Sequence, residues 1–402
     1  MELSAGDTAW VLASTALVLL MTPGLAFFYG GMTKAKSTLN MMMMSFAAIA
    51  IVSILWVVYG FSLAFGNSGS GYYGAFSLSG LSSAVGQLTN NGGMYGIPLL
   101  AFAGFQLMFA VITPALISGA IADRAKFLTW CIFIVLWVTI VYFPVAHWVF
   151  DFGDKDAAGN ITGAGWLASK GVLDFAGGTA VHINAGAAGL ALMDTQVATA
   201  AALGGWLIVE RIRDGHATSI GAASGAVAGL VAITPACAFV APWAAVVLGL
   251  VAGCVCSCAV GLKYKLNYDD SLDVVGIHLV GGIVGMLFIG FFSTTVVNSV
   301  GANGVFYGGG FDLLGKQALG VVAVAVYSFV VTLILGVALE KTLGFRITRD
   351  AELEGIDFVE HAESACGFQG LIDSGFINGE LTTQTKWVAA HDDVLVEMGS
   401  AR

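Results

Sequence analysis

Two histidines stand inside long apolar stretches of the sequence, where an ionisable side chain is costly. His182 ends the stretch Gly-Gly-Thr-Ala-Val-His, and His278 lies in Val-Val-Gly-Ile-His-Leu-Val-Gly-Gly. An ionisable group at membrane depth marks a candidate functional site. Two neutral imidazoles can share one N–H, which leaves their outer nitrogens for a passing solute, and an ordinary pKa of about 6.5 suits a proton relay. The alternative is that each ring only satisfies a backbone carbonyl.

An aspartate precedes each of these histidines. Asp174 stands eight residues before His182, and Asp273 stands five residues before His278. Asp174 suits a functional carboxylate, but it also suits the N-cap of the helix that follows. Asp273 has the location expected of a carboxylate in the first turn of a helix.

Aromatic residues provide a further candidate for recognising a cation. Phe105 and Phe109 stand one helical turn apart, and a desolvated ammonium ion gains about 2 kcal/mol or more against an aromatic face. Phenylalanine pairs at this spacing are more often core, so this signal is weak alone. His147, beside Trp148, suits an anchor at the membrane surface.

The composition predicts that most of these residues lie in a membrane. The chain of 402 residues is 57% hydrophobic and 10% charged, whereas soluble domains carry about 25% charged residues. The net charge of −10 comes without a basic stripe, which argues against nucleic-acid binding. No sequence motif of a hydrolytic metal site or serine nucleophile is present, so we predict neither an enzyme nor a cofactor. The Cys-x-Cys-x-Cys run ending at Cys258 fits helix packing better than a metal site.

Nine apolar stretches are long enough to cross a bilayer, which takes about 20 residues. They are residues 9–28, 41–65, 98–122, 127–150, 175–209, 219–240, 241–262, 274–292 and 318–339. If the N-terminus lies outside, 13 of the 16 lysines and arginines fall on the inner side, as the positive-inside rule requires. We therefore expect a multi-pass protein of the cell membrane with an outer N-terminus and a cytoplasmic C-terminus.

Several motifs, taken in order, resemble the Amt/Rh ammonium transporter family. They are PGLAFFYGG at 23–31, NMMM at 40–43, Phe105-Gln106 with Phe109, PVAHW at 144–148, DFAGGTAVH at 174–182, ITPA at 233–236, Asp273 through His278, and GIDFVEHAE at 355–363. The resemblance covers nearly the whole chain. It implies an all-α membrane bundle built from two inverted halves, with the substrate path between them.

The resemblance also implies the site and the partners. Ammonium or ammonia would be the substrate, each subunit of a homotrimer would have its own pore, and the tail would meet a PII-type signal protein of nitrogen metabolism. Phe109 would form the outer constriction with Phe105 beside it. The implied pore residues are His182, His278, Phe109, Phe105, Phe150, Asp174 and Thr234. Phe150 stands where the family usually has Trp, which offers a stronger π face.

One segment departs from the family pattern. After the helix of His182 the family has a loop and a returning helix, but here Met193 runs directly into Asp194, so about 50 residues are missing near 192–194. Residues 175–209 as one helix would measure about 50 Å, well beyond the membrane core of about 30 Å. We therefore expect about nine spans in place of the family's eleven.

These observations give two functional hypotheses. The first is ammonium or ammonia transport through a hydrophobic pore with twin histidines, formed by a transporter domain at residues 1–345 with a cytoplasmic tail at 346–402. The alternative is a shortened, non-transporting member of the family that acts as an ammonium sensor or as a scaffold for a PII-type protein.

Overall fold

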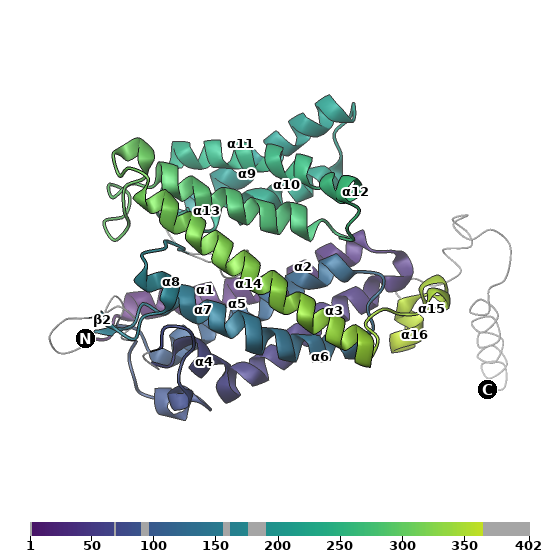
Figure 1. Cartoon of the computed structure of the whole chain (residues 1–402), viewed down its shortest axis with the longest axis horizontal. Coiled ribbons are helices and arrows are strands. Elements are labelled where there is room, and N and C mark those ends of the chain that lie inside the picture. Colours follow the sequence, from purple (N-terminus) through teal and green to yellow (C-terminus); the bar gives the residue numbers. More distant parts are fainter. Residues whose placement is uncertain (1, 68–69, 90–95, 156–160, 176–189, 365–402) are drawn as a thin grey trace, which may run out of the picture.

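Long apolar helices lying side by side make up most of the computed structural model (Figure 1). The structure describes residues 2–67, 70–89, 96–155, 161–175 and 190–364. Because the bilayer core has no water to bond backbone groups, helices that satisfy their own N–H and C=O groups are the expected form there.

The first half of the bundle comprises the helices that precede residue 151. Its elements are α1 (Ala5–Leu19), α2 (Met21–Met32), η1 (Ala35–Ser37), α3 (Thr38–Leu55), η2 (Trp56–Gly60), α4 (Phe61–Phe65), η3 (Phe76–Leu78), η4 (Ser82–Ala84), α5 (Leu99–Ser118), η5 (Gly119–Ile121), α6 (Phe127–Trp137), η6 (Val138–Tyr142) and α7 (Phe143–Phe150). A loop with the antiparallel ribbon β1 (Asp154–Lys155) and β2 (Ile161–Thr162) and the short α8 (Trp166–Ser169) follows.

The second half packs above the first in the view of Figure 1. It consists of α9 (Leu190–Arg213), α10 (Ser219–Ile233), α11 (Pro242–Ala259), α12 (Leu262–Leu266), η7 (Val275–Leu279) and α13 (Val280–Phe292). After η8 (Val305–Tyr307), α14 (Asp312–Thr342) runs diagonally across both halves and packs on α13 and α6. The chain then forms α15 (Arg349–Glu354) and α16 (Ile356–His361).

Within the described ranges, seven helical rods are long and apolar enough to cross a membrane. They are Ala5–Met32, Ala35–Phe65, Leu99–Ile121, Phe127–Phe150, Pro242–Leu266, Val275–Phe292 and Asp312–Thr342. These seven match all the predicted spans except the fifth and sixth. In those two places lie α9 and the 15-residue α10, so the expected number of nine spans holds approximately. Of the predicted run over 175–209, residues 190–209 belong to α9 (Leu190–Arg213), and residues 176–189 lie outside the described residues.

Small residues let α9 lie unusually close to its two neighbours, α10 and α11. A Cβ atom at Gly253 of α11 would overlap the carbonyl oxygen of Ala202, and one at Gly249 would overlap that of Ala198. On α10, a Cβ at Gly225 would lie 2.7 Å from Cβ of Trp206. The glycines of α10 thus allow the close helix packing that small residues permit in a membrane.

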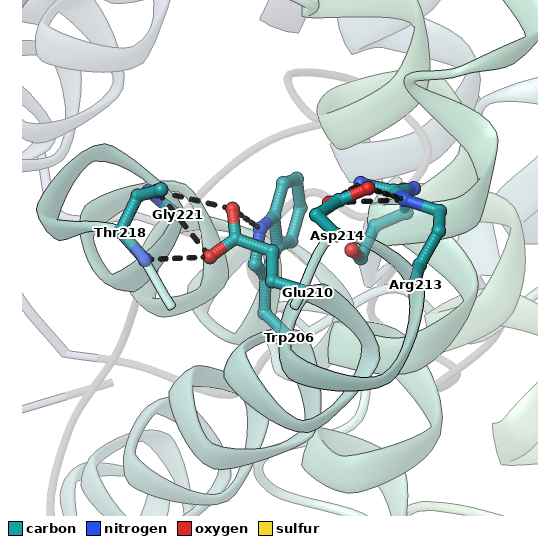
Figure 2. A network of polar contacts seen from close by, with 7 residues as sticks. Trp206, Glu210, Arg213, Asp214, Thr218 and Gly221 are labelled. Atoms are coloured by element: carbon teal, nitrogen blue, oxygen red, sulfur yellow. Dashed lines mark hydrogen bonds and ion pairs between the residues drawn. The ribbon is translucent and has the colours of Figure 1, made fainter. Parts of the chain in front are cut away.

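A buried carboxylate joins the ends of α9 and α10 (Figure 2). Glu210, at 8% exposure, accepts hydrogen bonds from the backbone N–H of Thr218 at 2.9 Å and from the indole of Trp206 at 3.2 Å. The Thr218 hydroxyl bonds the same carboxylate and also caps α10 by accepting from the Gly221 N–H at 2.8 Å. This network fixes the turn between the two helices.

The segment after α14 forms α15 and α16 at one end of the bundle, where α16 contacts η1 and α3 (Figure 1). Asp357 accepts hydrogen bonds from the N–H groups of Leu39 at 3.0 Å and Asn40 at 2.7 Å. Glu360 accepts one from the Phe127 N–H at 3.0 Å. The N-cap residues of α3 and α6 make no side-chain cap of their own, so α16 supplies the missing acceptors for both helices.

Candidate pore site

His278 lies in the π-helical turn η7, where the chain enters the rod that continues as α13. Its side chain is buried at 7% exposure. A π turn inside a helical rod often marks a functional site because it re-aims side chains. Here it breaks the regular helix at the histidine itself.

The start of this rod is anchored by Asp270. Its carboxylate accepts hydrogen bonds from the N–H groups of Val274 at 3.0 Å and Val275 at 2.8 Å, which completes the helix end. Burial raises the pKa of Asp270, against the effect of these two donors. Asp273, expected to be the first-turn carboxylate, instead has a left-handed backbone and pairs with Lys263 at 2.6 Å. The helix-capping role therefore belongs to Asp270.

The three predicted phenylalanines belong to the first half. The rings of Phe105 and Phe109 on α5 lie 5.0 Å apart in an edge-to-face arrangement at 81°. Phe150, the last residue of α7, is 7% exposed. Phe109 and Phe150 are members of the largest buried apolar cluster, and Phe105 packs against that cluster. The aromatic pair expected from the spacing is therefore present.

Asp174 and Thr234 lie on two segments that meet. The backbone N–H of Phe175 donates to the carbonyl of Pro235 at 3.4 Å, so each site residue is one position from this bond. Both side chains are buried at 5% exposure, and the Thr234 hydroxyl donates to the Leu230 carbonyl at 2.6 Å.

The peptide before Asp174 is also held from α14. Gln317, fully buried, accepts a hydrogen bond from the N–H of Leu173 at 2.8 Å and donates one to its carbonyl at 2.8 Å. A third, longer contact of 3.5 Å joins the same amide to the carbonyl of Met286 on α13.

His182 lies outside the described residues, so the expected contact between the two imidazoles stays a prediction. The structure brings Phe105 to Phe109, and the segment of Asp174 to that of Thr234. His147 was expected to anchor the membrane surface, but its side chain is fully buried. Its Nδ1 lies 3.0 Å from the Ala64 carbonyl and 3.1 Å from the Asp151 carboxylate.

A sequence model described as the Ammonium Transporter Family matches residues 9–193 and 191–366. The chain belongs to the ammonium transporter family. A Mycobacterium tuberculosis protein named ammonium transporter is 47% identical over 444 residues, covering 92% of each chain. A Bacillus subtilis ammonium transporter is 40% identical over 414 residues, covering 90% of this chain and 98% of that protein.

Solved structures of other proteins have the same fold. Mep2 of Saccharomyces cerevisiae superposes with a TM-score of 0.78 at 29% identity, covering 87% of this chain and 89% of that one. A structure titled Sensor Amt Protein gives a TM-score of 0.76 at 24% identity, covering 88% of this chain and 98% of that one, a likeness of fold alone. The family places this chain among membrane transporters of ammonium rather than among enzymes.

Three anchoring residues of this ammonium transporter were missed in the sequence. Glu210 and Asp270 stand at the ends of apolar stretches, where ordinary solvated carboxylates are also common. Gln317 stands one residue before the predicted span 318–339. Contacts with nearby residues of the chain distinguish Glu210 and Asp270 from surface residues. Gln317 is distinguished by contacts with residues far away in the sequence. Among the described residues, no group of His, Cys, Asp and Glu could hold a metal ion, and Cys256 is buried while Cys258 is exposed.

Proposed function

We propose that ammonium is captured near Asp174 and Phe150, and that ammonia then passes Phe109 and moves along a dry route lined by His182 and His278. The observation that carries the proposal is the buried His278, placed in a π turn of a membrane rod in a member of this family. A histidine on the surface would be solvated and would require neither burial nor a π turn.

The chemistry follows from the cost of charge in a membrane. Ammonium is stable in water, but carrying a bare cation through an apolar bundle costs several kcal/mol or more. Loss of one proton converts it to neutral ammonia, which can move between aromatic and aliphatic walls. An imidazole can donate a hydrogen bond to that ammonia, or accept one from it, and can pass the released proton onward.

We further propose that about 50 residues of the family pattern are absent after Met193. Two findings support this. The two matched stretches of the family model meet and overlap at residues 191–193. The alignment with the Mycobacterium tuberculosis relative spans 444 residues, more than the 402 in this chain, so it must open gaps in this chain. In this proposal α9 takes up the position after the missing crossing.

The remaining expectations for the assembly are proposals on the same footing. The transporter domain spans residues 1–345, and the chain forms homotrimers in the plasma membrane. The N-terminus lies outside, and the tail from 346 to 402 lies in the cytoplasm, where a PII-type protein would meet it. The exposed Lys34, Arg346 and Arg349 at the tail-bearing end support this orientation, because inner loops carry the positive charge.

The test is uptake of methylammonium by cells lacking their own ammonium transporters and expressing this chain. Variants His182→Ala and His278→Ala are compared with His216→Ala, which removes an exposed histidine of the loop after α9. Each variant is normalised to the amount of protein in the membrane fraction. We expect uptake by the parent chain and by His216→Ala, and a loss of at least tenfold in the other two.

Two results would count against the proposal in different ways. Uptake by the parent chain that equals that of empty cells would contradict transport and favour the sensor or scaffold alternative. Normal uptake by both His182→Ala and His278→Ala would leave transport in place but reject the histidine-lined route.

A further inference from the structure

The amide side chain of Gln317 makes two hydrogen bonds to the backbone of Leu173, the residue before Asp174, and this pair of bonds is called the grip. Its oxygen accepts from the Leu173 N–H and its nitrogen donates to the Leu173 carbonyl, both at 2.8 Å. The paired bonds resemble those between two strands of a sheet. They fix both the position and the orientation of the backbone immediately before Asp174.

This grip lies where water cannot replace it. Gln317 is fully buried, and a buried amide that loses its hydrogen-bond partners destabilises the folded state. Buried polar side chains in folded proteins are therefore almost always hydrogen-bonded. One bond would satisfy one atom of the amide, but here both the donor and the acceptor are directed at the same residue.

The grip also connects the Asp174 segment to the helix of His278. The Gln317 nitrogen lies 3.5 Å from the carbonyl of Met286, on the rod that begins with the π turn of His278. On the other side of Asp174, the Phe175 N–H donates to the Pro235 carbonyl. The backbone around Asp174 is thus held from both sides by elements of the second half and by α14.

We propose that Gln317 is a positioning residue for ammonium capture. It holds the carboxylate of Asp174 in place at the mouth and sets it in register with the rod that carries His278. The proposal rests on the proposed function, because Asp174 matters for capture only if ammonium enters there. Gln317 itself is not expected to touch the solute.

The competing explanation is that Gln317 only helps α14 to pack. A purely structural amide would affect how much protein folds, and so the maximal rate of uptake, without changing the apparent affinity. A positioning role predicts instead that the half-saturating concentration rises, because the capture geometry is disturbed in protein that is folded.

The first measurement is hydrogen exchange of the purified protein, which does not depend on transport. Gln317→Met keeps the length of the side chain and removes both bonds to Leu173. Gln317→Glu keeps an acceptor for the Leu173 N–H and, when ionised, loses the donor. We expect exchange of a peptide covering 171–175 to speed up about tenfold in Gln317→Met, with Gln317→Glu between it and the parent.

The matched control is Thr332→Val on the same helix. Thr332 accepts a hydrogen bond from the indole of Trp137 at 2.8 Å, so this variant also removes one bond between α14 and the first half. It should leave exchange of 171–175 unchanged. If Gln317→Met fails to fold, the comparison of Gln317→Glu with Thr332→Val still decides the point.

The second measurement is the concentration dependence of methylammonium uptake in the same variants. We expect the half-saturating concentration to rise several-fold in Gln317→Met and to stay unchanged in Thr332→Val. Unchanged exchange at 171–175 would overturn the grip, and faster exchange with unchanged half-saturation would overturn its role in capture. Absence of uptake by the parent chain would instead overturn the proposed function, and with it a role of Gln317 in ammonium capture. Hydrogen exchange would still test the hydrogen bonds between Gln317 and Leu173.

Discussion

Removal of the Asp357 carboxylate tests whether its hydrogen bonds to the start of α3 hold the tail on the bundle. Asp357 is 1% exposed and bonds the N–H groups of Leu39 and Asn40. Two hydrogen bonds to a charged group would contribute about 3 to 6 kcal/mol together. Burial raises the pKa of Asp357 in spite of these donors, so desolvation offsets part of that gain. Losing an N-cap costs about 0.5 to 2 kcal/mol, and we therefore expect about 2 kcal/mol for Asp357→Ala.

This energy acts on docking of the tail more than on unfolding of the whole bundle. A loss of 2 kcal/mol multiplies the undocked population about 30-fold. Local opening of this kind can be followed by proteolysis, which tracks the open population when cleavage is slower than closing. Arg349 is exposed at the start of α15 and offers a trypsin site next to the docked segment.

The assay is the rate of tryptic cleavage after Arg349 in detergent-purified protein. Asp357→Ala should be cleaved about 30-fold faster than the parent chain. Glu363→Ala is the control, because it removes an exposed carboxylate just beyond α16 and changes the net charge equally. Equal cleavage rates in the two variants would refute the reasoning. The effect of Asp357→Ala would then come from the lost charge and not from the lost hydrogen bonds to α3.

Three further substitutions test the packing of the second half. Burial raises the pKa of Asp270, so its folded form binds a proton more tightly than the unfolded chain does. The melting temperature of the parent should therefore fall relative to Asp270→Asn as pH rises from about 4, and parallel curves would contradict this. Glu210→Ala should lower the free energy of unfolding by about 2 to 3 kcal/mol, because Thr218 loses a buried charged acceptor; an unchanged melting temperature would show that water replaces it. Gly253→Val should fail to give a single folded peak in size-exclusion chromatography, whereas Gly336→Val, whose Cβ would meet nothing within 4 Å, should give one.

The apolar rods were predictable from the sequence because the hydrophobicity of consecutive residues is enough to identify them. Seven of the nine predicted stretches coincide with rods of the structure, and breaks inside them follow local signals. The predicted boundary near Pro235 and Pro242 is a true break, with α10 ending at Ile233 and α11 beginning at Pro242. Proline at the first turn of a helix and the loss of an N–H donor explain this without tertiary information.

The groups that hold the site together were not predictable in the same way. Asp357 and Leu39 are far apart in the sequence, as are Gln317 and Leu173, and only the fold brings them together. Nothing local in the motif GIDFVEHAE shows what His361 contacts, yet its Nε2 lies 3.0 Å from the side-chain oxygen of Asn40. A polar residue near a helix end can be solvated or can anchor a distant backbone. The choice depends on its neighbours in space.

Asp194, near the start of α9 (Leu190–Arg213), lies next to the point where the two matched stretches of the family meet. Asp194 is fully buried, and neither of its carboxylate oxygens has a hydrogen-bond partner among the described residues. A buried charge without a partner is costly, and a bundle built for this sequence would be expected to provide one. The two matched stretches of the family meet at 191–193, immediately before this residue. Four positions on, Ala198 begins the close packing against Gly249. The close packing of α9 on α11 therefore begins one helical turn after Asp194.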